Sequence, residues 1–147
     1  MSQIKKILVA YDGSHQSKEA LNWAIDLSLL SGAQVAAVKV FEGSRLYPAI
    51  AETGGRELAA LLDQIRREDQ QLMDDVAKAG KARGVAIKCD ILQGNIAEQI
   101  LKYAKDYAYD LIIAGAKGHG ALEQLLMGSV TRNLVSLSRI PVLVVKD

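Results

Sequence analysis

The stretch Gly115-Ala-Lys-Gly-His-Gly-Ala-Leu-Glu-Gln-Leu-Leu-Met-Gly-Ser-Val-Thr131 joins an apolar segment to the start of a helix. The segment before it, Leu111 to Ala114, is short and fully apolar, as expected for a buried strand of a parallel sheet. Clustered glycines let backbone N–H groups converge, because no Cβ stands in the way. A helix start at Gly128 adds unpaired N–H donors and the positive end of a dipole. The stretch therefore predicts a phosphate-binding loop.

Two standard nucleotide motifs do not fit this stretch. A Walker A loop, Gly-x4-Gly-Lys-Ser/Thr, fails because Ala121 follows Gly120 where the lysine belongs. A dinucleotide fingerprint, Gly-x-Gly-x-x-Gly, that starts at Gly118 fails at Glu123. Both motifs also belong after an early strand, where this chain has Asp12-Gly-Ser with its single glycine. Phosphate binding here depends on a different spacing.

The spacing that is present is Gly115-x2-Gly118-x9-Gly128-Ser129. With it the chain resembles the universal stress protein family, in its ATP-binding branch. The segment Ile7-Leu-Val-Ala-Tyr-Asp-Gly-Ser14 is similar to the first strand and turn of that family, and residues 129–145 are similar to its last helix and strand. The resemblance covers essentially all 147 residues, which implies a single universal stress protein domain over residues 1–147.

Composition bounds the class of protein. The chain is 50% apolar and 5% aromatic over 147 residues, which suits one α/β domain that folds without disulfides or metal. A net charge of +1 gives no reason to expect a nucleic-acid partner. No apolar run approaches the length of a membrane span, and the single cysteine, Cys89, excludes an internal disulfide framework. We expect a soluble, cytoplasmic protein without membrane partners.

Strand and helix patterns alternate along the chain, which predicts a parallel sheet with helices on both faces. Strands are expected at 4–11, 35–41, 85–92, 111–114 and 141–145, and helices at 14–31, 56–83, from Asn95 to about 108, and at 130–138. The family resemblance implies an open five-stranded sheet in the order 3-2-1-4-5, Rossmann-like and similar to adenine nucleotide alpha hydrolases. In this order the ligand crevice lies between strands 1 and 4, where Asp12 and Gly115 meet.

Several helix ends carry recognisable capping residues. Ser14 is a candidate N-cap, Gly32 a candidate stop, and Asn95 with Glu98 resembles a capping box. The connection over residues 42–55 is long for a compact domain. It is interpreted as either mobile or functional, for example as a flap over a ligand.

Asp12 has two interpretations. Asp-Gly-Ser is ordinary turn chemistry, so its carboxylate caps the turn. Alternatively the carboxylate faces the crevice and orients a nucleotide through a ribose hydroxyl or a Mg²⁺-bound water, which its position and the family resemblance favour. The family also holds adenine near the ends of strands 1 and 2, which by position implies Ala10 and Val38. Both residues are equally interpretable as core.

The loop supplies the other candidates for ATP binding. Its glycines bring backbone donors to the phosphates, the helix start adds N–H and hydroxyl groups, and its lysine is either a cation beside the phosphates or an incidental surface residue. They are Gly115, Lys117, Gly118, Gly128, Ser129, Val130 and Thr131. His119 has no nucleophile or acidic partner within the motif, and two scattered histidines do not make a metal site. No catalytic residue is assigned.

The sequence thus predicts an ATP-binding regulatory module, with Mg²⁺ balancing the triphosphate and with a conformation or an unknown protein partner as its output. One alternative is a slow ATPase or phosphotransferase at the same site, for which only Asp12 is a candidate base and Arg132 a candidate arginine finger. A nucleotide-free dimeric interaction protein is the other, and the intact glycine spacing argues against it.

The last expected strand carries a separate signal. Val142, Leu143, Val144 and Val145 are apolar on both faces, yet the final strand of this sheet lies at its edge. An exposed apolar edge promotes aggregation unless it is covered. We expect two copies to pair along it as a homodimer, which the family resemblance also implies.

Overall fold

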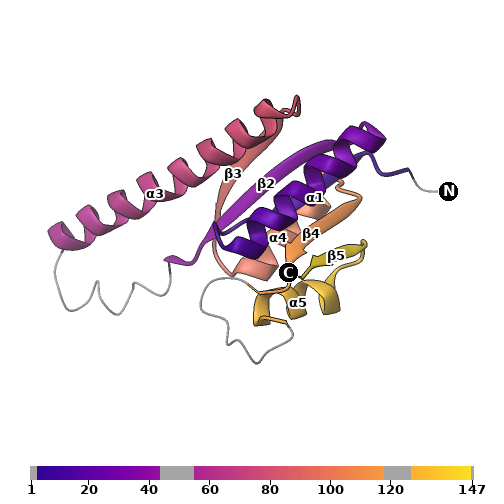
Figure 1. The fold of residues 1–147 in the computed structure, drawn as a ribbon. Helices are drawn as coiled ribbons and strands as arrows, with labels where there is room; N and C mark the ends of the chain where they lie inside the picture. Colours follow the sequence, from indigo (N-terminus) through magenta and orange to yellow (C-terminus); the bar gives the residue numbers. More distant parts are fainter. Residues whose placement is uncertain (1–2, 44–54, 118–126, 147) are drawn as a thin grey trace.

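The structure is a computed structural model that describes residues 3–43, 55–117 and 127–146 of the chain. Five parallel strands form one open sheet in the order β3-β2-β1-β4-β5, which confirms the predicted fold class and strand order (Figure 1). The strands are β1 (Lys6–Ala10), β2 (Gln34–Phe41), β3 (Ile87–Gln93), β4 (Leu111–Gly115) and β5 (Val142–Val145).

Helices cover both faces of the sheet. The side chains of α1 (His15–Ser31) and α3 (Gly55–Ala82) pack on one face, and those of α4 (Ile96–Asp106) and α5 (Ser129–Leu137) pack on the other. Adjacent residues of the central strands alternate between the two cores, so Val9 faces α1 whereas Leu8 faces α4, each with no exposed surface. Burial on both faces explains why the central strands are continuous apolar runs.

The predicted N-cap and C-cap of α1 are confirmed, and so is Asn95 as the N-cap of α4. The Ser14 hydroxyl accepts a hydrogen bond from the Ser17 N–H at 3.3 Å, and Gly32 ends α1 in the left-handed region at φ 77°. The Asn95 side chain accepts from the Glu98 N–H at 3.1 Å. These caps fix the starts of α1 and α4, and the first of them lies next to the candidate crevice.

Some element ends differ from the prediction by one or two residues. β3 begins at Ile87 rather than Val85, because the Val85 N–H donates to the Gly80 carbonyl in the turn that follows α3. α5 begins at Ser129 rather than Val130, because the N-cap is Gly128, in an extended conformation. Most of the predicted 42–55 connection, residues 44–54, lies outside the described residues, as does the stretch 118–126.

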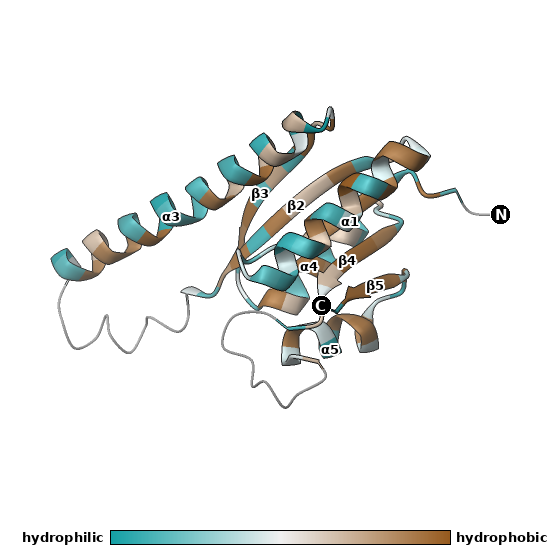
Figure 2. Cartoon of the chain, in the orientation of Figure 1, coloured by the Kyte–Doolittle hydropathy of each residue, from teal (hydrophilic) through white to brown (hydrophobic). Residues whose placement is uncertain are grey.

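Helix α3 is the longest element, 28 residues or about 42 Å. Its C-terminal half packs on β2 and β3, and its N-terminal half extends past the sheet (Figure 1). Its outward face is hydrophilic (Figure 2). Leu72 reaches the turn after β1, where a Cβ added to Gly13 would lie 2.9 Å from its Cδ2. The buried Asp69 carboxylate pairs with Lys39 of β2 at 2.8 Å.

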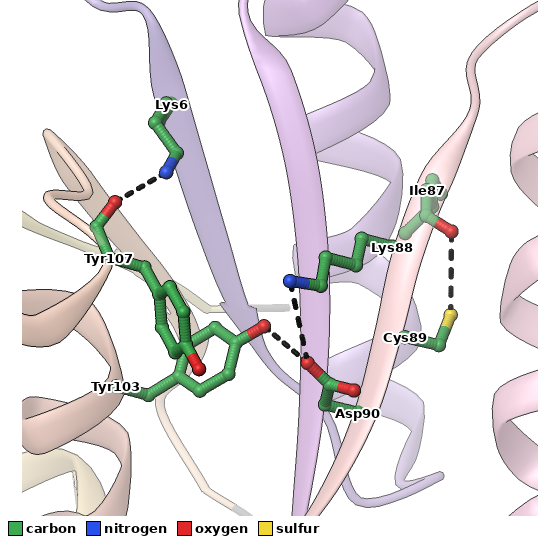
Figure 3. A network of polar contacts seen from close by, with 7 residues as sticks. All are labelled: Lys6, Ile87, Lys88, Cys89, Asp90, Tyr103 and Tyr107. Carbon is green, nitrogen blue, oxygen red and sulfur yellow. Dashed lines mark hydrogen bonds and ion pairs between the residues drawn. The ribbon is translucent and has the colours of Figure 1, made fainter.

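Tyr103 and Tyr107 connect α4 to β3 and β1 on the opposite face of the sheet (Figure 3). The Tyr103 hydroxyl donates to the Asp90 carboxylate at 2.5 Å, and Lys88 lies 3.9 Å from the same carboxylate. The Lys6 ammonium donates to the Tyr107 carbonyl at the C-terminal end of α4, where a cation complements the helix dipole.

Across the described ranges, every helix is too short or too polar to cross a membrane.

Candidate functional site

The carboxyl ends of β1 and β4 lie side by side at the switch point of the sheet. Val9 pairs with Ile113 in the parallel register, so the turn at Asp12 and the segment after Gly115 leave the sheet next to each other. The first turn of α1 then brings Gln16 against the end of β4. The two parts of the chain that the sequence singled out therefore meet, as predicted.

Asp12 caps the turn that follows β1. One carboxylate oxygen, Oδ1, accepts the Ser14 N–H at 2.9 Å, and the Asp12 N–H donates to the Ser17 hydroxyl at 3.4 Å. This geometry matches the turn interpretation. It leaves the ligand interpretation compatible, because a carboxylate has about four acceptor positions and the Asp12 residue is only half-buried.

Gly115 is a glycine for a steric reason that the sequence did not reveal. A Cβ at this position would lie 2.7 Å from the Cβ of Gln16 and 2.9 Å from its carbonyl carbon. The Gly115 carbonyl accepts the hydroxyl of Thr131 at 2.7 Å, and that threonine is 4% exposed. Close packing of β4 on α1 thus requires glycine here, and its phosphate contact remains a prediction.

Backbone and side-chain hydrogen bonds tie the two ends of the glycine loop together. The Ala116 N–H donates to the Val145 carbonyl, and the Ala116 carbonyl accepts the Gly128 N–H, each at 2.8 Å. The Lys117 N–H donates to Oε1 of Gln16 at 2.6 Å. Gly118, the second motif glycine, lies outside the described residues. The start of α5 is consequently held at the end of β4.

The first turn of α5 follows the glycine loop and is part of the candidate phosphate site. Its N-cap, Gly128, has no side chain that hydrogen-bonds to the N–H groups of this turn. Ser129 is not the N-cap, because it is the first helical residue, and it is exposed. Val130 is half-buried. Helix N–H groups without a cap, together with the helix dipole, attract anions.

Ala10 and Val38, the residues predicted near adenine, pair in the register of β1 and β2. Val38 is 1% exposed and packs in the core beneath α4, while Ala10 is partly exposed at the end of its strand. The Val38 carbonyl accepts the Tyr11 N–H at 3.0 Å. The Val38 side chain therefore belongs to the core. Contact of Ala10 and Val38 with adenine remains a prediction.

A protein-bound metal centre does not fit the described part of the site. Across residues 3–43, 55–117 and 127–146, no three His, Cys, Asp or Glu side chains gather in a way that could hold a metal ion. Asp12 would offer a single carboxylate. A Mg²⁺ ion fits such a site only when phosphate oxygens supply much of its coordination shell.

Gln16 is the site residue that the sequence did not single out. It belongs to no glycine motif, and its partner Lys117 lies 101 residues further along the chain. Only the parallel pairing of β1 with β4, which places α1 over the end of β4, brings the two together.

The fold and site define an α/β protein with a doubly wound parallel sheet and a glycine loop at its switch point. The family model "Universal stress protein family" matches residues 3–146, and the chain belongs to this family. It is 36% identical over 142 residues to universal stress protein MJ0531 of Methanocaldococcus jannaschii, an alignment that covers 97% of this chain and 82% of that protein.

Solved structures share the fold. The structure of MJ0577, from the same organism, superposes with a TM-score of 0.87 at 30% identity and covers 99% of this chain and 98% of that one. A universal stress protein in complex with cAMP (TM-score 0.72, 20% identity) covers 99% of this chain and 98% of its own. One from Archaeoglobus fulgidus in complex with dAMP (TM-score 0.68, 19% identity) covers 98% of each. At these identities the last two establish similarity of fold.

Proposed function

We propose that this universal stress protein binds an adenine nucleotide, with ATP as the ligand, between the carboxyl ends of β1 and β4. The observation that carries the proposal is the uncapped start of α5, which is fastened to the end of β4 beside the Asp12 turn. The fold relatives solved with cAMP and dAMP support an adenine nucleotide as the class of ligand.

The proposed phosphate contacts come from both ends of the loop. N–H groups of the first turn of α5 and the Ser129 hydroxyl contact the phosphates, and Gly128 at the N-cap lets them approach because it has no side chain. Lys117 and Gly118 contribute phosphate contacts from the segment that follows β4. Mg²⁺ binds together with the triphosphate, and Asp12 contacts it through a water molecule or contacts the ribose. Adenine lies near Ala10 and Val38.

The proposed output is regulation by binding. Phosphoryl transfer requires a positioned nucleophile and charge stabilisation of the transition state. Asp12, the candidate base, accepts the Ser14 N–H through Oδ1, so this oxygen holds the turn after β1. We therefore propose at most slow ATP hydrolysis. A change at Asp12 would reach α3 directly, because Leu72 packs against Gly13.

Calorimetric titration with Mg-ATP tests this proposal, after any nucleotide released by denaturing the freshly purified protein has been identified by chromatography. Gly128→Val should abolish binding, because its side chain enters the phosphate space. Ser129→Ala should weaken binding by about 1 kcal/mol. Ser136→Ala, at an exposed serine near the other end of α5, is the matched control and should bind as the parent does.

Each alternative has its own outcome. Binding accompanied by release of inorganic phosphate would establish the slow ATPase. If no nucleotide is released and no heat of binding is measured, the nucleotide proposal fails and the dimer surface becomes the functional feature of the molecule.

We further propose a homodimer formed through the free edge of β5. The sheet has two edges, and the β3 edge carries charged side chains at Lys88 and Asp90, which disfavour pairing with another strand. The β5 edge is apolar throughout and is drawn in brown in Figure 2. Self-pairing of one edge about a two-fold axis gives a closed dimer.

A further inference from the structure

We propose that Gln16 is a positioning residue that holds the limb 115–117 after β4 against α1 and thereby positions the proposed phosphate site at the adjoining start of α5. The inference rests on the proposed function for its nucleotide part. Its structural part, that the side-chain amide of Gln16 holds the Lys117 backbone, stands on the contacts of these residues alone.

The backbone of Gln16 is held in place by its own helix. Gln16 is the second residue of α1, whose N-cap Ser14 is bonded to Ser17 by its hydroxyl and to Lys18 by its carbonyl. Its Cβ and carbonyl carbon fill the space that a side chain at Gly115 would need. A fixed helical turn therefore abuts the last residue of β4.

The side chain of Gln16 continues this contact into the loop. Oε1 accepts the Lys117 N–H at 2.6 Å, two residues after the contact at Gly115. Ala116, between them, is held on its N–H by Val145 and on its carbonyl by Gly128. Successive backbone groups of the limb are thus fixed by three different elements, and Gln16 supplies the last of these contacts before the motif glycine at 118.

Two consequences follow for nucleotide binding. The Lys117 N–H is used by Gln16, so among the described residues the phosphate donors are those of the first turn of α5. Because Gln16 holds the limb 115–117 to which α5 is bonded, its loss should affect ligands in proportion to their phosphate contacts. ATP should lose affinity, whereas adenosine, which has no phosphate, should not.

The test compares the parent with Gln16→Ala, Gln16→Glu and Lys18→Ala. Alanine keeps helix propensity and removes the acceptor. Glutamate keeps an acceptor, because a carboxylate oxygen accepts the same N–H. Lys18 is exposed on the same turn, so its alanine variant controls for a general effect on α1. Hydrogen exchange of the Lys117 amide is measured by NMR without ligand, and the affinities for ATP and adenosine by calorimetry.

We expect the Lys117 amide to exchange about five times faster in Gln16→Ala, the ratio that corresponds to one ordinary hydrogen bond, and at the parent rate in Gln16→Glu and Lys18→Ala. Gln16→Ala should lower the affinity for ATP several-fold and leave the affinity for adenosine unchanged. Equal exchange in parent and Gln16→Ala would overturn the inference, as would faster exchange with unchanged ATP affinity. If the parent binds no ATP, the proposed function fails, and the exchange rates still decide whether Gln16 holds the Lys117 backbone.

Discussion

The hydroxyl of Thr131 donates a hydrogen bond to the carbonyl oxygen of Gly115 across 2.7 Å, although 16 residues separate them in the chain. The contact is buried and joins the strand before the glycine loop to the helix after it. The Thr131 hydroxyl is one of the phosphate donors predicted from the sequence. In this geometry it fastens the loop, and the exposed hydroxyl of Ser129 is the better candidate for phosphate.

Replacing Thr131 by valine should lower the free energy of unfolding by about 1 to 3 kcal/mol. Valine has nearly the same shape but leaves the buried Gly115 carbonyl without its donor. Thr131→Ser keeps the hydroxyl and should be the more stable of the two variants. Urea unfolding followed by circular dichroism measures both. A valine variant as stable as the parent would show that the hydroxyl does not hold the loop.

Gly115→Ala should destabilise the fold by overpacking, at a cost of about 1 to 3 kcal/mol. The new methyl group would lie within 3.0 Å of three atoms of Gln16, two of them backbone. Gly55→Ala is the control, because nothing lies within 4 Å of its added Cβ and alanine favours the first turn of α3. Thermal unfolding of the three proteins should rank Gly115→Ala lowest.

Much of the fold could be predicted from local patterns. The apolar runs at Ile7–Val9 and Leu111–Ala114 identify central strands because both of their faces are buried. Ser14 and Asn95 mark helix starts because their side chains accept N–H groups three residues on. The strand order then places Asp12 beside Gly115 without any knowledge of side-chain contacts.

Contacts between distant residues could not be predicted in this way. The acceptor for the Lys117 N–H lies on α1, and Thr131 turns back to β4, so neither appears in a local spacing. The many charged residues of α3 follow a pattern typical of a solvated face, yet Asp69 is 5% exposed. A carboxylate can be buried when a cation meets it, and the cation, Lys39, lies on another element.

Removing one member of the Lys39–Asp69 ion pair should lower the free energy of unfolding, whereas replacing both members by apolar residues should change it little. Asp69→Asn leaves the largely buried ammonium of Lys39 without its counter-charge and should destabilise by about 2 to 4 kcal/mol. The double variant Lys39→Met with Asp69→Leu removes both charges and should be close to the parent. A double-mutant cycle in urea, which includes Lys39→Met alone and Asp69→Leu alone, measures the energetic coupling of the pair. Additive effects of the two single changes would mean that the pair is not energetically coupled.

Tyr103 should make stability fall at high pH. Burial, followed by its hydrogen bond to Asp90, raises the Tyr103 pKa well above the usual 10.0. Below pH 10 both the folded and the unfolded chain keep the proton of Tyr103, so its full contribution to the free energy of unfolding is present. Above pH 10 the unfolded tyrosine ionises while the folded one does not, and the free energy of unfolding decreases.

Tyr103→Phe tests this assignment. It should cost about 1 kcal/mol at pH 8 through the lost hydrogen bond to Asp90. Between pH 10 and 11 its stability should fall less steeply than that of the parent, by up to about 1.4 kcal/mol per pH unit for one proton. Parallel slopes for the two proteins would contradict the raised pKa.

The β5 edge offers a change that separates dimerisation from folding. The carbonyls of Pro141 and Val145 point toward β4. Backbone groups alternate in direction along a strand, so the N–H and carbonyl of Val144 point to the free edge. Val144→Pro would remove an N–H that β4 does not use, which proline tolerates at an edge. It should convert the proposed dimer to a folded monomer.

Light scattering coupled to size-exclusion chromatography at micromolar concentration measures this change, with circular dichroism as the check on folding. Val144→Thr keeps the N–H and a β-branched side chain, so it should remain dimeric. A parent that is monomeric under these conditions would sink the proposed dimer. A dimeric Val144→Pro would instead place the interface elsewhere, because an antiparallel pair centred on this short strand depends on the outward N–H groups of Val142 and Val144.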